Sequence, residues 1–336
     1  MEDTQHILSL SGGKDSTALA LLGREELEAN EIANLMLVFA DTGNEHQDTY
    51  DYVDYLQNKV FKSVPFKTVK ADFSVQMGKK RAFIQEHWKE DLVAAGLSEA
   101  EAEDRVAKAL NILRPTGNPF LDLCLWKGRF PSTRRRFCSE ELKHKPIDKQ
   151  VIEPALEEYD DVFSWQGVRA DESPSRAKLA EFEEHPTRWG LTTFRPILSW
   201  NVDRVFDMHR KHGVKPNPLY KQGMKRVGCM PCIHCGKKEM REIARRFPEE
   251  VKRISEWEAM VSDAAKRGVS TFMDARVTAK LLNTGTSVDE IHHTTHGIHA
   301  YVDWAKTSHG GKQIDLIAVA EQDDIPLCSS LYGLCE

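Results

Sequence analysis

The segment of residues 11–17, SGGKDST, constrains the fold more than any other part of this chain. It follows a short apolar run at 6–10 and leads into a second apolar run at 16–22, STALALL, which has helical character. Two glycines between a strand and a helix let backbone N–H groups approach an anion, and the helix N-terminus adds a partial positive charge. Lys14 adds a mobile cation. We therefore expect a strand–loop–helix unit that binds phosphate.

This loop differs from two other phosphate-binding loops. A Walker loop would place four residues between its first glycine and the Gly-Lys pair, and a dinucleotide fingerprint would need a third glycine. Neither pattern is present in residues 11–17. The alternatives left are a phosphate loop of another class and an ordinary glycine turn between a strand and a helix.

Apolar runs and helical patterns alternate along the chain. Further strands are expected at 35–40, 67–69 and 161–168. Helices are expected at 47–58, 78–112, 140–156 (interrupted at Pro146), 202–213 and 237–261 (split near Pro248), whereas 113–136 is expected to be mostly loop. Alternation with near-continuous apolar strands predicts an α/β fold with an open, mostly parallel sheet covered by helices on both faces. Four tryptophans are expected in the core or between helices: Trp165, Trp189, Trp200 and Trp257.

The composition fits a globular protein, with 40% hydrophobic and 29% charged residues. The chain has no apolar run of about 18 residues, and its N-terminus lacks signal-peptide features, so we expect a cytoplasmic protein without membrane contact. A net charge of -6 does not by itself indicate a nucleic-acid binder. Basic side chains gather at 127–145 and 221–238, beside cysteines, which indicates either an anionic substrate or a solvated charged face.

Three of the seven cysteines, Cys229, Cys232 and Cys235, form a Cys-x2-Cys-x2-Cys loop. Because a reducing compartment disfavours disulfides, this spacing indicates ligation of a metal or cluster, and free buried cysteines are the alternative. Four histidines form a second group: His292, His293, His296 and His299. We expect solvated histidines there in preference to a metal site, because no carboxylate or cysteine lies at ligand spacing.

SGGKDST directly after a strand resembles the loop of the PP-loop ATP pyrophosphatase superfamily. Asp41-Thr42-Gly43 ends the second strand, and residues 167–176, GVRADESPSR, follow a later one. Together they resemble the phosphoadenosine phosphosulfate reductase family over about residues 6–240. The resemblance implies a nucleotide-binding domain at 1–213 and, at 214–336, a cysteine loop, helices and a tail. The residues expected at the nucleotide are Ser9, Ser11, Gly12, Gly13, Lys14, Asp15, Ser16, Asp41, Thr42, Gly43, Arg169 and Arg176.

The two arginines in that set have the role of binding phosphate or sulfate in the family, and guanidinium groups suit it. The alternative is that they form surface salt bridges with Asp171 and Glu172. Iron–sulfur members of the family also imply a [4Fe–4S] cluster on Cys138, Cys229 and Cys232, with zinc as the alternative metal. The expected fourth ligand is Cys235, and Cys328 or Cys335 are the other candidates.

The resemblance implies an enzyme that uses ATP and Mg²⁺ to adenylate an oxygen before sulfur transfer, with Lys14, Asp15 and Cys335 as catalytic residues. It is similar to the sulfur-inserting component of DNA phosphorothioation systems, so a cysteine desulfurase, DNA-modification proteins and a homodimer are expected partners. The first alternative is a sulfonucleotide reductase acting on adenosine phosphosulfate or phosphoadenosine phosphosulfate. Its tail motif is displaced here, in residues 331–336. The second alternative is a non-catalytic nucleotide sensor.

Overall fold

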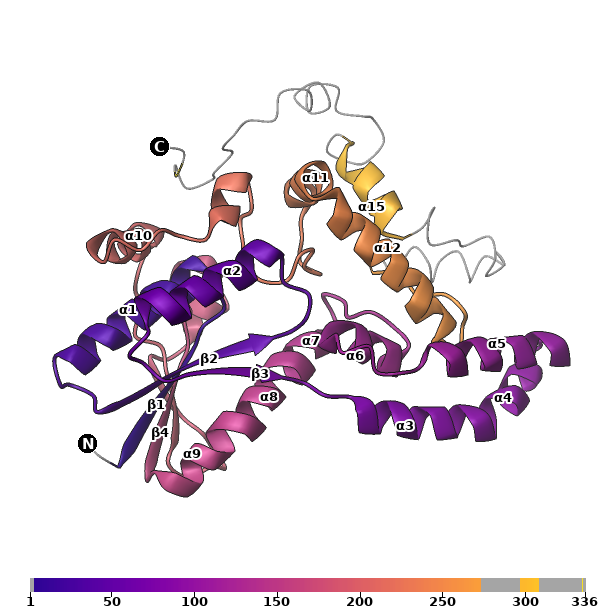
Figure 1. Cartoon of the computed structure of the whole chain (residues 1–336), viewed down its shortest axis with the longest axis horizontal. Helices are drawn as coiled ribbons and strands as arrows, with labels where there is room; N and C mark the ends of the chain where they lie inside the picture. The colour runs from indigo at the N-terminus through magenta and orange to yellow at the C-terminus, as the bar shows by residue number, and fades with distance from the viewer. Residues whose placement is uncertain (1–2, 273–296, 308–333, 335–336) are drawn as a thin grey trace.

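The computed structural model describes residues 3–272, 297–307 and 334, and its centre is a sheet whose strand order is β3-β2-β1-β4-β6-β5 (Figure 1). The strands are β1 (Thr4–Ser9), β2 (Asn34–Asp41), β3 (Phe66–Lys70), β4 (Asp161–Trp165), β5 (Phe182–Glu184) and β6 (Leu191–Phe194). All neighbouring pairs are parallel except β5 with β6, which is antiparallel. The mostly parallel α/β sheet is therefore confirmed.

The helices that pack on the sheet are α1 (Lys14–Glu28), α2 (Gln47–Tyr55), α8 (Lys145–Ile147), α9 (Glu153–Glu158) and α10 (Val202–Lys211). Those of the remaining described parts are α3 (Ser74–Phe83), α4 (Lys89–Ala94), α5 (Glu99–Ile112), α6 (Pro119–Lys127), α7 (Phe137–Ser139), α11 (Lys237–Arg246), α12 (Pro248–Asp263) and α15 (Ile298–Ala305). No helix in the described ranges is long and apolar enough to cross a membrane.

β1 lies in the middle of the sheet because its residues are apolar towards both faces. Ile7 and Leu8 are both 0% exposed, although successive side chains of a strand point to opposite faces. Leu8 packs with α1, α2 and α10, and Ile7 packs with Val151 and Ala155 on the opposite side. Figure 1 shows the same two layers, with α1 and α2 on one side of the sheet and α8 and α9 on the other.

The structure differs from the sequence expectations about helices in two places. Within the stretch expected to be mostly loop, α6 begins at Pro119, with Asn118 as its N-cap, and ends at Gly128 in the left-handed conformation. The Asn-Pro pair at 118–119 and the glycine at 128 are thus the boundaries of helix α6. The helical segment from 137 to 158 also runs through Pro146 without a break, because wide π-type turns flank the proline.

A second hydrophobic core holds α3, α5 and α6 against α11, α12 and α15. In Figure 1, α3, α4 and α5 extend away from the sheet as an arm, and α12 lies across it. Lys80 fixes this arm, because its Nζ donates to the carbonyls of Leu125 at 2.9 Å and Ala264 at 3.0 Å.

The tryptophans differ in their burial. Trp257 lies in this second core and Trp165 in the sheet core, as expected, but Trp189 is 98% exposed and that expectation is wrong.

Glu258 is a fully buried carboxylate on α12 that fastens two other segments. Its oxygens accept hydrogen bonds from the amides of Phe272 at 2.7 Å and Ile298 at 3.0 Å. Burial raises the pKa of Glu258 to about 7, and the two amide donors only partly offset this effect. The carboxyl is therefore protonated more readily in the folded protein than in the unfolded chain.

We predict that this carboxyl makes stability fall as pH rises. A raised folded-state pKa contributes stability that is complete below the ordinary pKa of 4.5 and is lost as pH approaches 7. The free energy of unfolding of the wild type, relative to that of Glu258→Gln, should fall by up to roughly 3 kcal/mol across this range. Urea denaturation of both proteins from pH 4.5 to 7.5 measures the difference. A constant difference would contradict the prediction.

Candidate nucleotide-binding site

The loop of residues 11–16 leaves the carboxyl end of β1 and enters α1. Gly12 has φ +71°, and a Cβ there would lie 3.1 Å from the side-chain methyls of both Thr49 and Val53 on α2. Only glycine adopts this conformation without strain. Position 12 therefore needs glycine both for its backbone conformation and for the close approach of α2.

The hydroxyl groups of the loop serve mainly to fix its shape. Ser16 Oγ accepts from the Ser11 amide at 3.1 Å and donates to the Gly13 carbonyl at 3.1 Å, to which Thr17 Oγ1 also donates at 2.9 Å. Because the N-cap residue is Gly13, it offers no side chain to the first turn of α1, although Tyr220 Oη accepts from the Lys14 amide. First-turn amides have no intrahelical acceptor, so this helix end can donate to an anion.

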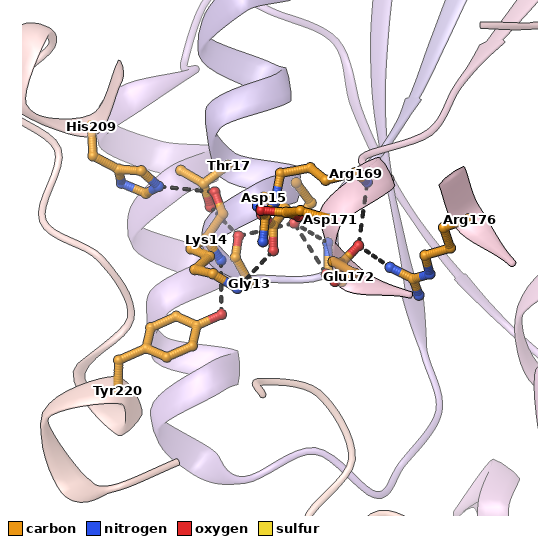
Figure 2. A network of polar contacts seen from close by, with 12 residues as sticks. Gly13, Lys14, Asp15, Thr17, Arg169, Asp171, Glu172, Arg176, His209 and Tyr220 are labelled. Carbon is orange, nitrogen blue, oxygen red and sulfur yellow. Dashed lines mark hydrogen bonds and ion pairs between the residues drawn. The ribbon is translucent and has the colours of Figure 1, made fainter. Parts of the chain in front are cut away.

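A chain of ion pairs joins the loop to the segment after β4. Asp15 Oδ2 lies 2.9 Å from Lys14 Nζ, and Asp15 Oδ1 lies 2.6 Å from Arg169 Nε. Figure 2 shows the Asp15 carboxylate between the two cations. Arg169 also pairs with Asp171 at 2.6 Å. Burial opposes the charge of the Arg169 guanidinium, but Asp15 and the neighbouring carboxylates raise its pKa above the usual range.

The two predicted arginines occupy different settings. Arg169 is 4% exposed and its side chain donates to Asp15, so its ion pairs are not surface salt bridges. Arg176 is about a third exposed and pairs with Glu172, as the alternative reading expects. Glu172 in turn accepts from the Arg169 amide at 3.3 Å, and Arg176 is therefore linked to the loop through one carboxylate (Figure 2).

Three residues that clamp the loop were missed by sequence reasoning. The Lys14 amide donates to Tyr220 Oη at 3.0 Å, and Asn217 Nδ2 donates to the Gly12 carbonyl at 3.2 Å. His209 Nε2 lies 2.9 Å from the Lys14 carbonyl, and burial lowers the pKa of this histidine. All three lie about two hundred residues after the loop, and only the Asn-Pro pair at 217–218 signals a turn.

Gly167 explains how the β4 segment comes so close to the loop. A Cβ at this position would lie 3.2 Å from the Ser16 amide and 3.3 Å from the Asp15 carbonyl carbon. That is tighter than an ordinary contact, so a larger residue would push the two segments apart. Gly167 therefore allows Arg169, two residues later, to reach Asp15.

The predicted Asp41–Gly43 segment follows β2 and is largely committed to protein contacts. Asp41 pairs with Lys70 at 2.5 Å and accepts from the Gly43 amide at 2.9 Å and from Tyr50 Oη at 2.8 Å. A Cβ at Gly43 would lie 2.8 Å from Asn118 Oδ1. This segment therefore connects β2 to the start of α6.

The cysteine loop docks on the residues that follow β2. Cys229 forms an isolated antiparallel bridge with Glu45, and the Met230 amide donates to the Asn44 carbonyl at 2.7 Å. Cys229 Sγ lies 3.5 Å from Thr42 Oγ1 and 3.9 Å from a Glu45 carboxylate oxygen. The predicted residues Thr42 and Cys229 are thus neighbours. The cysteine loop therefore lies at the edge of the sheet formed by the carboxyl ends of the strands, where the loop of residues 11–16 also lies.

Three of the four predicted ligand thiols lie within electrostatic range of the fourth, Cys232. Burial raises the pKa of Cys138, of Cys229 (to about 12) and of Cys235, and the charge of Cys232 raises each of them further. The raised pKa values keep Cys138, Cys229 and Cys235 protonated at neutral pH. Within the described ranges, no three or more His, Cys, Asp or Glu side chains are grouped so that they could hold a metal ion.

Lys143 is a further residue at this place that sequence reasoning did not assign. Burial lowers its pKa, but Cys229, Glu45, Cys232 and Cys138 raise it more, so the ammonium group faces the thiols.

Several of the remaining predicted residues lie outside the described residues: Cys328, Cys335, His292, His293 and His296. His299 lies on α15 with its side chain exposed, as a solvated histidine would.

We predict that Gly12→Ala weakens ATP binding by about tenfold or more, because the new Cβ strains the backbone and meets α2. Gly78→Ala is the matched control, since a Cβ there meets nothing within 4 Å and Gly78 lies inside α3. This control should keep wild-type affinity and gain stability slightly. Calorimetric titration with ATP measures both variants. Equal affinity in Gly12→Ala would contradict the role assigned to this glycine.

Comparison with known proteins places the chain in a family. The model of the phosphoadenosine phosphosulfate reductase domain matches residues 5–235. An uncharacterized 37.8 kDa protein of Escherichia phage 186 is 50% identical over 342 residues, which cover 100% of this chain and 98% of that protein. The adenosine 5'-phosphosulfate reductase of Staphylococcus haemolyticus is 33% identical over 82 residues, covering 24% of this chain and 33% of the reductase.

Among solved structures, the phosphoadenylyl-sulfate reductase of Candida auris aligns with a TM-score of 0.39 and 15% identity, over 68% of this chain and 82% of that one. The family match rests on the domain model, because it covers more than half of the chain. The chain belongs to the phosphoadenosine phosphosulfate reductase family.

Proposed function

We propose that this chain binds ATP at the loop of residues 11–16 and releases pyrophosphate while it adenylates an oxygen of an acceptor, as a step towards sulfur transfer. The observation that carries the proposal is the N-terminus of α1, which has no N-cap side chain and lies beside two buried cations, Lys14 and Arg169. Amides at a helix N-terminus, a lysine ammonium group and an arginine guanidinium group can together bind the oxygens of a polyphosphate.

In this reaction the acceptor oxygen attacks the α-phosphorus of ATP. The bond from that phosphorus to the bridging oxygen breaks, and pyrophosphate leaves with the electron pair. The first-turn amides and Lys14 stabilise the charge that develops on the leaving group. Asp15 holds Lys14 and Arg169 in place before the nucleotide arrives. Arg169 is then positioned to bind the α-phosphate or the adenylated product.

The described residues leave little room for a protein-bound Mg²⁺ at the loop. Both carboxylate oxygens of Asp15 are already paired, one with Lys14 and one with Arg169. We therefore assign the Mg²⁺ that accompanies ATP to the phosphate oxygens, where it supplies charge neutralisation.

The cysteines carry a second part of the proposal. Thiolates are suitable donors for a [4Fe–4S] cluster, or for zinc, and Cys138, Cys229 and Cys235 all lie near Cys232. The present arrangement does not fit either metal, because no group of three ligands converges among the described residues. Loading would need the loop to adjust, and we assign no chemical step to the cluster. A cysteine desulfurase as sulfur source and DNA as acceptor remain expectations from the resemblance.

A sulfonucleotide reductase is the second candidate function, because the matched family model carries that description. The phosphosulfate of its substrate would then be held by the same amides and by Arg169. Cys335 would be its nucleophile, but this residue lies outside the described ranges. The two candidates differ in their products, which are pyrophosphate for the first and sulfite for the second.

We predict that purified protein releases pyrophosphate from ATP and Mg²⁺ once an acceptor is supplied, and that Lys14→Ala slows this release by about a hundredfold. Lys252→Ala is the control, because Lys252 is an exposed lysine on α12. A coupled pyrophosphate assay measures the rates, and a parallel assay follows sulfite from adenosine phosphosulfate. Sulfite production without any pyrophosphate release would establish the second candidate instead.

We also predict that Cys232→Ser removes most of the iron from anaerobically purified protein, because Cys232 lies near the other three thiols. Cys124→Ala should retain the iron, since Cys124 is a fully buried residue of α6 in the apolar core. Iron and acid-labile sulfide analysis, together with zinc analysis, measures the outcome. Equal iron in wild type and Cys232→Ser would exclude this ligand set, and stoichiometric zinc would favour the alternative metal.

A further inference from the structure

The two basic stretches of the sequence meet beside the cysteine loop. Phe137 and Cys138, which lie within the first stretch, pack in the same hydrophobic cluster as Val227 and Cys232 from the second. The first stretch exposes Arg134, Arg135 and Arg136, and the second exposes Arg226 and His234, among other residues. Burial, Arg226 and Arg136 all lower the pKa of His234, so both arginines lie within electrostatic range of one imidazole.

The three consecutive arginines have no carboxylate partner among the described residues. Arg134, Arg135 and Arg136 are exposed, and within the described parts of the chain none of them forms an ion pair. The arginines around β4–β6 behave differently, because Arg169, Arg188 and Arg195 each pair with a carboxylate. A short turn, in which the amides of Ser132 and Arg135 donate to each other's carbonyls at 3.2 and 3.1 Å, holds the three arginines outward.

This basic surface adjoins the nucleotide loop. A Cβ at Gly13 would lie 3.9 Å from the Val227 carbonyl oxygen, so the residue after Arg226 is in contact range of the loop. Arg226 itself has one acidic neighbour, Glu239, whose pKa is raised by burial and lowered by Arg226. Residues 134–136 add three exposed positive charges to this region.

We propose that Arg134, Arg135, Arg136 and Arg226 form a surface that binds the phosphate backbone of a nucleic acid beside the nucleotide loop. A small anion is normally held by a few donors that converge in a pocket. Exposed guanidinium groups spread over a turn and a neighbouring loop instead match phosphates repeated along a strand. This inference rests on the proposed function in one respect: the nucleic acid would be the acceptor that must reach the loop of residues 11–16. Binding of the nucleic acid to the four arginines does not itself require ATP.

The test is a binding titration with a fluorescent 20-base-pair DNA duplex, followed by anisotropy at several salt concentrations. The full-length triple variant Arg134→Gln/Arg135→Gln/Arg136→Gln should bind at least about tenfold more weakly than wild type. The slope of log Kd against log salt should fall by about two to three, because each duplex phosphate contact contributes about 0.9. Replacing the same three residues with lysine should preserve most of the affinity, since the charge remains.

The control variant Lys62→Gln/Lys149→Gln/Lys252→Gln removes the same charge from exposed positions elsewhere and should bind DNA like the wild type. ATP affinity should be unchanged in the arginine variant, which separates this test from that of the proposed function. Wild-type DNA affinity in the triple glutamine variant, or no DNA binding by the wild type at low salt, would overturn the proposal. Loss of ATP affinity without loss of DNA binding would overturn it too, because the arginines would then belong to the nucleotide site.

Discussion

The carboxylate of Asp15 is the interaction on which the candidate site depends, because it lies between two buried cations from different parts of the chain. Lys14 is 6% exposed and Arg169 4% exposed, and Asp15 bonds to both. A buried cation without a partner costs several kcal/mol, so Asp15 stabilises the close approach of the β4 segment to the start of α1. Gly167 makes that approach sterically possible. The same pairing keeps both cations at the helix end where a phosphate would bind.

The nucleotide loop and the cysteine loop are parts of one connected structure. The segment that begins at Asn217 first clamps the phosphate loop through Asn217 and Tyr220 and then continues into the cysteine loop. The cysteine loop in turn rests on the residues after β2, through the bridge between Glu45 and Cys229. Arg253 of α12 joins the same place, because it donates to Asn44 Oδ1 at 3.0 Å and to the Met230 carbonyl at 2.6 Å. The two loops are therefore joined by a short path of direct contacts.

The sheet and the phosphate loop could be predicted from the sequence because local signals define both. Apolar runs and a Gly-Gly turn mark β1, the loop and α1, whereas α6 was missed because its capping residues, Asn118 and Gly128, are also typical of loops. The pairing of Asp15 with Arg169 and the contacts of His209 and Tyr220 could not be predicted, since they join residues far apart in sequence and leave no local pattern. The domain boundary at 213 and the roles of Arg176 and Cys235 remain predictions.

A crystal structure of the protein with a non-hydrolysable ATP analogue and Mg²⁺ would show directly whether the loop of residues 11–16 binds the phosphates. We expect the phosphates to accept hydrogen bonds from the amides at the start of α1 and Lys14 to turn from Asp15 towards them. We also expect Arg169 to contact the α-phosphate region while its bond to Asp15 is kept. Phosphates bound elsewhere, for example on the arginines at 134–136, with the loop empty, would contradict the account.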